Sequence, residues 1–457
     1  MTTTSSRIRG SLYGVAVVDA LGGPVEFCQR GSFPPVTDFR YNSNFGLSAG
    51  TWTDDTSMTL CLAQSLVDTN GEFNVLDQVK KYVKWWDEGY MSATGTCFDI
   101  GNTTRQALAT WKRCIKDGES SEKEVSHCQK IINKSLGRAI FCGNGSLMRT
   151  APIPLIYHNS PSLAQHYALL ASTPTHPHPT CLSACQLYTH LITHILSLQH
   201  PNPNSDKSTL WTTLQNFPST KPDTDNPSTH PSLLSALFTP HPTLTTFQQK
   251  PSTEIKSSGY VIYTLEAALW AFFTTETFKE GALKVVNLGN DADTVGAVYG
   301  GLAGAWYGID NIPEEWLDGL QAKNIVDDVV EGVVALVEKG VYEGPKTYQF
   351  QAYLTYPYRF PKIHLIPAWI RPITPRSSIP LSHHVIHPSL LPANPPKTPD
   401  FPLPLPSHPH ALHKSRSKLP IKTTNTSKPI PHSPIPIPSK HLHNFLFGTR
   451  YFHSGGD

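Results

Sequence analysis

The stretch Gly289-Asn290-Asp291-Ala292-Asp293-Thr294 places two carboxylates and a hydroxyl directly before a long apolar segment. Within that segment, glycines recur every four residues, at positions 296, 300, 304 and 308, and Gly10 and Gly14 begin a similar series near the N-terminus. Glycine costs a helix about 1 kcal/mol relative to alanine, so repeated glycines on one face indicate helices whose backbones approach very closely. We therefore expect a central pair of tightly packed helices.

A second acidic run, Thr53-Asp54-Asp55-Thr56, also precedes an apolar helical stretch. The alternation in Asp291-Ala292-Asp293 would place both carboxylates on one side of an extended segment, whereas the adjacent Asp54 and Asp55 would diverge. Four carboxylates exceed what one Mg²⁺ needs, but they suit two hard cations that share bridging ligands. The alternative is that both runs are ordinary helix N-caps. The two runs together favour the metal site.

Helical periodicity dominates the first three quarters of the chain, and strand-like alternation is scarce. Apolar residues recur at four-residue spacing in several segments, for example Val261, Leu265 and Leu269. Similar series begin at Met58 and at Ile325. This pattern predicts an all-α fold.

Charge divides the chain of 457 residues into two parts. Residues 346–457 hold 13 of the 37 Lys and Arg but only Asp400 and Asp457 among 35 acidic residues, which leaves 24 basic and 33 acidic residues before them. The same segment holds about half of the prolines, which forbids long helices. We expect a helical domain at 1–345, interrupted by a low-complexity insertion at 199–257, and a basic, Pro/His-rich tail at 346–457 that is mostly disordered.

Cysteine usage is typical of a reducing compartment. All eight cysteines precede residue 186 and no Cys-x-x-Cys pair occurs, so we expect buried thiols. Cys181 and Cys185, near His176 and His178, would admit a zinc site, although a core position is the favoured interpretation. With neither a signal-peptide pattern nor a long apolar run, we expect a cytoplasmic or nuclear monomer that does not bind membranes.

Six motifs, in order over about residues 7–320, resemble the ADP-ribosylglycohydrolase family, and in particular its branch that contains the hydrolase acting on ADP-ribosylated dinitrogenase reductase. The motifs are Gly14-Val-Ala-Val-Val-Asp19-Ala-Leu-Gly22-Gly-Pro-Val-Glu26-Phe, Thr53-Asp54-Asp55, Asp99-Ile-Gly-Asn102-Thr-Thr, Gly143-Asn-Gly-Ser146-Leu-Met-Arg149-Thr-Ala-Pro, Ser258-Gly-Tyr260-Val-Ile-Tyr and Asn290-Asp291-Ala-Asp293-Thr294. Asn290 departs from the pattern, since many members have a second glycine there.

The resemblance implies a compact orthogonal helical bundle with two Mg²⁺ or Mn²⁺ ions at the base of an ADP-ribose cleft. The implied metal ligands are Thr53, Asp54, Asp55, Asp291, Asp293 and Thr294. Glu26 is the implied residue for activating water or touching the metals. Asp99 is implied to face the scissile bond, where a carboxylic acid could protonate the leaving group. The alternative for Asp99 is an N-cap of the helix that begins near Asn102.

The implied substrate-binding residues are Asn102, Gly143, Asn144, Gly145, Ser146, Met148, His176 and Tyr260. The turn from Gly143 to Ser146 offers consecutive backbone N–H groups, which suit a diphosphate. His176 is expected at the distal ribose or phosphate, and Tyr260 is expected to stack on adenine. Tyr263, one turn later, is expected in the core.

The function that follows is a metal-dependent hydrolase that releases ADP-ribose from a modified protein side chain or a related α-linked ADP-ribosyl compound. Two alternatives stay open: a catalytically silent family member that only binds ADP-ribose, and a metal-dependent nucleotide phosphoesterase. The tail does not favour a nucleic-acid-binding function, because its charges are spread over 112 residues with few interleaved aromatics.

Overall fold

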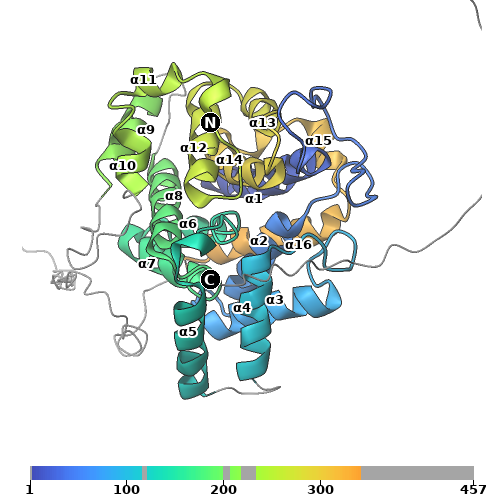
Figure 1. The fold of residues 1–457 in the computed structure, drawn as a ribbon, viewed down its shortest axis with the longest axis vertical. Helices are drawn as coiled ribbons and strands as arrows, with labels where there is room; N and C mark the ends of the chain where they lie inside the picture. Colours follow the sequence, from blue (N-terminus) through green and yellow to red (C-terminus); the bar gives the residue numbers. More distant parts are fainter. Residues whose placement is uncertain (1–2, 116–120, 199–205, 218–232, 341–457) are drawn as a thin grey trace, which may run out of the picture. The chain divides into compact units, whose positions relative to one another are not determined.

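The computed structural model describes residues 3–115, 121–198, 206–217 and 233–340 (Figure 1). In these residues the regular elements are α-helices and short 3-10 helices, together with two isolated β-bridges. The predicted all-α fold is thus confirmed. The predicted tail at 346–457 lies outside the described residues, as does part of the insertion at 199–257.

Helices α1 (Thr4–Gly22) and α14 (Ala292–Tyr307) form the buried centre of the domain, as the glycine spacing predicts (Figure 1). Gly14 faces Gly300: a Cβ added to Gly14 would lie 2.2 Å from the Gly300 carbonyl oxygen. A Cβ on Gly300 would lie 2.0 Å from the Gly14 carbonyl oxygen. The two backbones therefore touch, and no larger residue fits at either position.

The partners of the glycines also give the direction of the two helices. Gly10 lies against Gly304, while Gly22 lies against Ala292, so α1 and α14 are antiparallel. The C-terminal end of α1 consequently meets the N-terminal end of α14, where the acidic run begins. Gly308 also lies against Gly10, and its φ of 77° ends α14, a conformation that glycine adopts without strain.

The other helices surround this pair. The predicted apolar series that begin at Met58, Val261 and Ile325 lie on α2, α12 and α16, respectively. The remaining α-helices are α2 (Asp54–Asp68), α3 (Val75–Glu88), α4 (Asn102–Cys114), α5 (Glu122–Leu136), α6 (Pro152–Tyr157), α7 (Pro161–Ser172), α8 (Pro179–Ser197), α9 (Asp206–Gln215), α10 (Leu233–Phe238), α11 (Leu244–Gln248), α12 (Val261–Phe273), α13 (Phe278–Val286), α15 (Glu314–Asp318) and α16 (Lys323–Glu338). Helices α2 and α16 pack on α1, whereas α12 and α13 pack on α14.

Part of the predicted insertion belongs to the hydrophobic core. Helices α9, α10 and α11 contact α8 or α12 (Figure 1). Trp211 of α9 is buried and packs against Phe247 and Phe273 at ring-centroid distances of 4.8 and 5.5 Å. The buried Lys207 amine donates a 2.9 Å hydrogen bond to the Phe272 carbonyl at the end of α12. Within the described residues, no helix is long and apolar enough to cross a membrane.

Candidate active site

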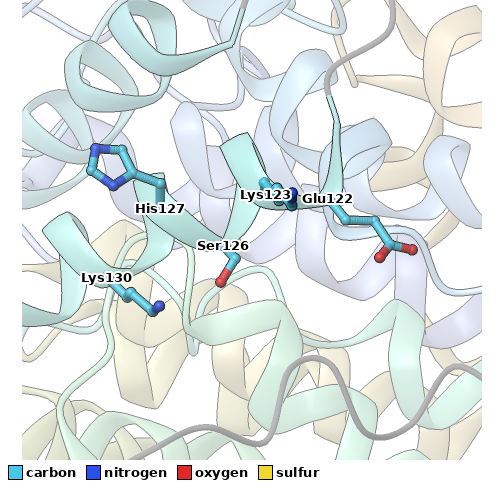
Figure 2. A pocket seen from close by; sticks show the side chains of 5 residues that line it. All are labelled: Glu122, Lys123, Ser126, His127 and Lys130. Atoms are coloured by element: carbon cyan, nitrogen blue, oxygen red, sulfur yellow. The ribbon is translucent and has the colours of Figure 1, made fainter.

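A surface hollow on α5 provides a contrast to the acidic runs. Its lining residues are Glu122, Lys123, Ser126, His127 and Lys130 (Figure 2). All five come from a single helix, and the set includes both an acidic residue, Glu122, and basic residues, Lys123 and Lys130. They form a solvated face of one helix, and the lining includes no residue from another element, so we assign no site there.

The two acidic runs begin helices α2 and α14, but the side chains of their N-cap residues do not cap those helices. Thr53 is the N-cap residue of α2 and Asp291 that of α14, and neither side chain makes a capping hydrogen bond. Neither N-cap residue therefore caps its helix, although Asp293 Oδ1 accepts the Thr294 N–H at 2.9 Å within the first turn of α14. The other carboxylate oxygens at the two helix starts are not used for capping.

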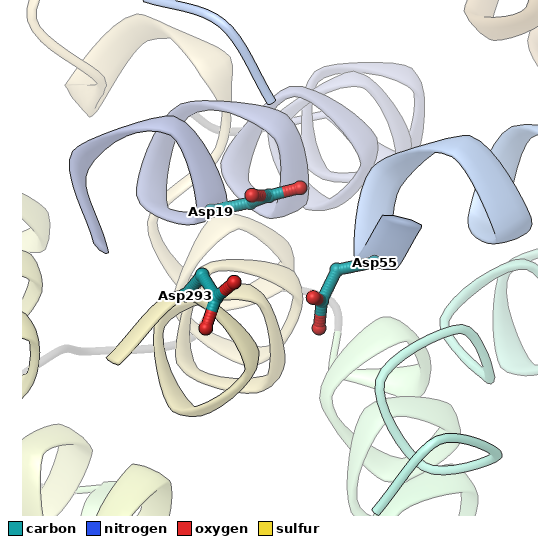
Figure 3. Close-up of side chains that lie close together, drawn as sticks. All are labelled: Asp19, Asp55 and Asp293. Atoms are coloured by element: carbon teal, nitrogen blue, oxygen red, sulfur yellow. The ribbon is translucent and has the colours of Figure 1, made fainter. Parts of the chain in front are cut away.

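The run around Asp293 is not extended, which corrects one sequence expectation. Ala292 and Asp293 already belong to α14. The carboxylates still converge, because the start of α14 meets the end of α1. Oxygens of Glu26, Asp291 and Asp293 lie within 4.8 Å of one another, and a second such group joins Asp293 to Asp55 and Asp19 (Figure 3).

The hydroxyls of the two runs lie in the same cluster. Thr53 Oγ1 is 3.1 Å from Asp55 Oδ2, and Thr294 Oγ1 is 3.3 Å from the same oxygen. Five of the six predicted metal ligands, namely Thr53, Asp55, Asp291, Asp293 and Thr294, thus lie together although their segments are more than 200 residues apart in the sequence. The buried Asp54 is next to Asp55 in the first turn of α2.

Asp19 is a member of this cluster that the sequence interpretation did not assign a role. It is fully buried on α1, and its carboxylate accepts hydrogen bonds from the backbone N–H groups of Thr53 and Thr56. A sequence signal was present: Asp19 is the single charged residue between positions 10 and 25. A charge in so apolar a helix is almost never buried without partners.

Burial raises the pKa values of the carboxylates in this cluster, and crowding adds to the effect for three of them. Burial is the largest cause for Asp54, Asp55 and Asp293, and the repulsion of neighbouring carboxylates adds to it, so that all three pKa values lie well above the ordinary range. Burial raises the pKa of Asp291 as well, and that of Asp19 to about 7. This much negative charge cannot coexist in one buried cluster without protons or cations.

Glu26 and Asp99 form a carboxyl pair at the edge of the cluster. Their carboxyl groups lie within hydrogen-bond reach of each other, and the buried atoms Glu26 Oε2 and Asp99 Oδ2 receive no other donor from the described residues. Burial, with the nearby Asp293 and Asp99, raises the pKa of Glu26 strongly, and burial raises the pKa of Asp99 to about 6. Both shifts favour a proton shared between the two carboxyl groups.

The backbone at Asp99 excludes its alternative role. The N-cap of α4 is Gly101, so Asp99 does not cap that helix. Asp99 instead adopts a φ of 60°, an uncommon conformation for a residue other than glycine. Asn102 is exposed at the first position of α4.

The chemistry of the cluster fits divalent cations. Its side chains offer only oxygen atoms, which suit Mg²⁺ or Mn²⁺. Asp55 Oδ1 is buried and receives no hydrogen bond from any described residue, as is also true of Glu26 Oε2. Unpartnered buried carboxylate oxygens are costly in a protein interior, and a cation would satisfy them.

A neutral loop, Gly143–Ser146, lies beside the acidic cluster. Asn144 joins the two, since its Nδ2 donates to Asp291 Oδ2 at 2.6 Å and to Thr264 Oγ1 at 2.9 Å. The Asn144 N–H donates to the Gly259 carbonyl, so it is not available for a diphosphate. The N–H groups of Gly145 and Ser146 have no such bond within the part of the chain described. This shortens the predicted run of free donors.

Arg149 holds the neutral loop in place through hydrogen bonds of its side chain. Its guanidinium is buried and donates to the Gly145 carbonyl and to Thr175 Oγ1, both at 2.7 Å. Thr175 Oγ1 in turn lies 2.8 Å from His176 Nδ1. The Thr175 hydroxyl accepts from Arg149 and can donate its own proton to Nδ1, in which case the imidazole carries its proton on Nε2. Burial and the Arg149 charge lower the pKa of His176 to about 3, so this imidazole is neutral.

The remaining predicted substrate-binding residues differ in their exposure. Ser146 and Met148 are buried; the Ser146 hydroxyl bonds to Ser172, so its side chain faces the core. Tyr260 is half-buried and forms an edge-to-face pair with Tyr263 at 5.0 Å. Tyr263 was expected in the core, but it is half-buried and its hydroxyl accepts a hydrogen bond from the Lys256 amine.

The cysteines near His176 have partners other than a metal. Cys181 Sγ donates to the Gly143 carbonyl at 3.4 Å, and Cys185 Sγ donates to Ser146 Oγ at 3.5 Å. His178 Nδ1 accepts the Thr180 N–H at the start of α8. Among the described residues, the groups suited to a metal consist of carboxylates alone, which agrees with a core role for the two thiols.

The sequence and the fold both match known proteins. An ADP-ribosylarginine hydrolase Tri1 from Serratia proteamaculans is 33% identical over 329 residues, which cover 71% of this chain and 78% of that protein. The enzyme of the same name from Pseudomonas putida is 35% identical and covers 68% and 73% of the two chains. An ADP-ribosyl-[dinitrogen reductase] glycohydrolase from Rhodospirillum rubrum is 28% identical and covers 71% and 91%.

A solved structure, described as an ADP-ribosylglycohydrolase-related protein complex, superposes with a TM-score of 0.53 at 32% identity, covering 74% of this chain and all of the other. The sequence profile of the ADP-ribosylglycohydrolase family matches residues 1–344, which include every residue of the acidic cluster and of the neutral loop. This chain belongs to the ADP-ribosylglycohydrolase family.

Proposed function

We propose that this protein is a metal-dependent hydrolase that cleaves the bond between ADP-ribose and a modified protein side chain, with ADP-ribosylarginine as its first candidate substrate. The observation that supports this best is the hydrogen bond from Asn144 to Asp291. It holds the loop suited to a diphosphate against the carboxylates suited to two cations. A diphosphate and its attached ribose could therefore contact both parts at once.

Mg²⁺ or Mn²⁺ ions would be held by the six residues Thr53, Asp54, Asp55, Asp291, Asp293 and Thr294. Two such cations, when bound, supply positive charge that fixes vicinal ribose hydroxyls and polarises the bond at C1″. The crowding that raises the carboxylate pKa values would then be relieved, because the cations replace the protons. The arginine linkage is favoured because the two relatives with 33% and 35% identity are named for it.

The Glu26–Asp99 pair would manage the proton of the reaction. Cleavage by water needs a group that accepts a proton from the water and one that supplies a proton to the leaving side chain. Two carboxyl groups that share one proton near neutral pH can serve in both ways. The leaving group gains a proton from the pair, and the attacking water returns one, so the pair ends with the same charge.

The neutral loop would bind the diphosphate. The N–H groups of Gly145 and Ser146, together with the Nε2–H of His176, are donors without charge, held in place by Arg149. Neutral donors orient phosphate oxygens without adding a competing counterion for the carboxylates. Tyr260, which begins α12 beside this loop, would stack on the adenine.

The decisive experiment is a substrate panel with product identification. Peptides ADP-ribosylated on arginine or on serine would be incubated with the protein and Mg²⁺ or Mn²⁺, and the products separated by chromatography. We expect free ADP-ribose from the arginine peptide, and no release in excess EDTA. Release of AMP or phosphate would instead indicate a phosphoesterase, and binding of ADP-ribose without release would indicate a silent family member.

A further inference from the structure

We propose that Asp19 is a positioning residue that caps helix α2 from helix α1, and that this cap is what frees Thr53, Asp54 and Asp55 to bind cations. The inference rests on the metal site of the proposed function. Asp19 Oδ1 accepts the Thr53 N–H at 3.0 Å and the Thr53 hydroxyl at 2.9 Å. Asp19 Oδ2 accepts the Thr56 N–H at 3.0 Å and the Thr56 hydroxyl at 2.5 Å.

These contacts replace the usual local cap. The first N–H groups of a helix have no partner within the helix and are ordinarily satisfied by the side chain of the N-cap residue. In α2 the Thr53 side chain makes no such bond, and Asp19 accepts the donors at the N-cap and third positions in its place. The acidic side chains of the first turn are thereby released from a capping role.

Asp19 lies near enough to the cluster to be taken for a ligand, but its bonding argues otherwise. An ionised carboxylate has about four lone-pair sites, and four donor groups from Thr53 and Thr56 already occupy them. Asp55 Oδ1, by contrast, is buried without a donor. The structure thus assigns Asp55 to the metal and Asp19 to the support of α2.

The Thr53 hydroxyl shows how this support acts on a ligand. It has one proton and two carboxylate neighbours, Asp19 at 2.9 Å and Asp55 at 3.1 Å. When the proton goes to Asp19, the Thr53 oxygen keeps its lone pairs for a cation. Without Asp19, the proton would go to Asp55 and would occupy a carboxylate oxygen that the metal site needs.

Asp19 also fixes the two halves of the ligand set relative to each other. It lies less than one helical turn before Gly22, whose added Cβ would be 2.4 Å from the Ala292 carbonyl oxygen. The end of α1 is therefore held against the start of α14 by backbone contact. By capping α2 from this point, Asp19 ties the Asp54–Asp55 half to the Asp291–Asp293 half.

The test is metal binding, measured apart from hydrolysis. Asp19→Asn keeps the size of the side chain but turns an amide donor toward the N–H groups of α2. Thr56→Val is a milder variant that removes one hydroxyl contact. Ser11→Ala is the matched control: Ser11 lies on the same buried helix, and its hydroxyl bonds to the Gly301 carbonyl, about 12 Å along α1 from Asp19.

Calorimetric titration of the metal-free, full-length protein with Mn²⁺ alone should show wild-type binding and a 10- to 100-fold weaker affinity for Asp19→Asn, about the usual effect of removing a group that supports a metal ligand. Thr56→Val should weaken Mn²⁺ binding by a smaller factor, and it carries the test if Asp19→Asn does not fold. Ser11→Ala should lower the melting temperature while keeping the Mn²⁺ affinity.

Two outcomes would contradict these proposals, and the experiment distinguishes one from the other. A wild-type protein that binds no Mn²⁺ would overturn the metal site of the proposed function. Wild-type affinity in Asp19→Asn, or in Thr56→Val if the former does not fold, would overturn the inference alone, because Asp19 would then be only a structural cap.

Discussion

The acidic cluster and the neutral Gly143–Ser146 loop are neighbours joined by Asn144, yet they differ in how their polar groups are paired. In the cluster, several carboxylates are crowded in a buried space, and Asp55 keeps an oxygen without a donor. In the loop, the terminal nitrogens of Arg149 donate to Gly145 and Thr175, and Thr175 contacts His176, although Arg149 Nε has no acceptor among the described residues.

This difference between the cluster and the loop shows which part of the site depends on its ligand. The loop is pre-organised, because its protein contacts already hold the donors in place. The carboxylates of the cluster repel one another, and only protons or cations relieve that repulsion. Perturbations of the cluster should therefore change metal binding and stability together, whereas perturbations of the loop should change nucleotide binding alone.

The largest effect is expected from Asp54→Ala or Asp293→Ala. Each variant removes an anionic ligand from the shared centre, and loss of the metal costs several kcal/mol of transition-state stabilisation, or about 10⁴-fold in turnover. The metal-free variants should melt higher than the metal-free wild type, because a buried repulsion is removed. Turnover and thermal-shift assays would test this; full release of ADP-ribose in excess EDTA would contradict the metal hypothesis.

Asp99→Asn should separate proton transfer from binding. Asparagine keeps the size and the hydrogen bonding but cannot hold the shared proton, so turnover should fall by roughly 10²–10⁴-fold, the usual contribution of a positioned acid or base. ADP-ribose affinity, measured by calorimetry, should stay close to that of the wild type. If the affinity is lost instead, Asp99 positions the substrate and has no acid–base role.

Gly145→Ala should damage the loop and spare the cluster. An added Cβ would lie 2.8 Å from His176 Cε1 and 3.2 Å from Thr104 Oγ1, so either the ring or the loop must move. We expect ADP-ribose affinity to fall about tenfold, which is about 1.4 kcal/mol, with unchanged Mn²⁺ affinity.

The matched control for Gly145→Ala is Gly332→Ala on α16, where the new methyl meets only Val67 side-chain atoms, the nearest at 3.2 Å. Both affinities should stay at their wild-type values in this control. A parallel loss of Mn²⁺ binding in Gly145→Ala would show that the loop and the cluster are not separable.

The pH dependence of stability should differ with and without metal. Folding raises the carboxylate pKa values, to about 6 for Asp99 and well above the ordinary range for Glu26, Asp55 and Asp293. The folded state therefore binds more protons than the unfolded state above pH 4, and stability falls as pH rises through the folded pKa values.

Between pH 7 and 9 we expect the melting temperature of the metal-free protein to fall by roughly 5 °C. Saturating Mg²⁺ should remove the carboxylate part of that decrease, since cations replace the protons. Unfolded imidazoles are mostly neutral in this interval, whereas buried thiols such as Cys61, whose pKa values folding raises, contribute a decrease with and without Mg²⁺. A metal-free melting temperature that rises over the interval would contradict the prediction.

The smallest effect is expected from removal of residues 346–457. Every residue of the cluster and of the loop lies between positions 19 and 294, and α16 ends at Glu338. A protein of residues 1–345 should keep the melting temperature and the hydrolysis rate of the full chain. Aggregation of the shortened protein, or a melting temperature many degrees lower, would show that the tail is part of the fold.

Local sequence patterns were sufficient for the helices and for the positions of the two acidic runs; the six metal ligands stay a prediction. The glycine spacing predicted the close contact of α1 and α14, because only glycine lets two backbones touch. The acidic runs identified the two helix starts. The segment at 206–217 was harder: its Pro- and Thr-rich surroundings hide Lys207 and Trp211, which are buried against α12.

The sequence by itself determined which residues carry negative charge and that they stand at helix starts, since both properties are local. Only the tertiary structure decided how those starts are supported. Asp19 caps a helix that begins 35 residues later, Glu26 meets Asp99, and Asn144 reaches Asp291 across 147 residues. Such pairings depend on how α2 and the loops at Asp99 and Asn144 pack around the ends of α1 and α14, and no periodicity within one segment encodes that placement.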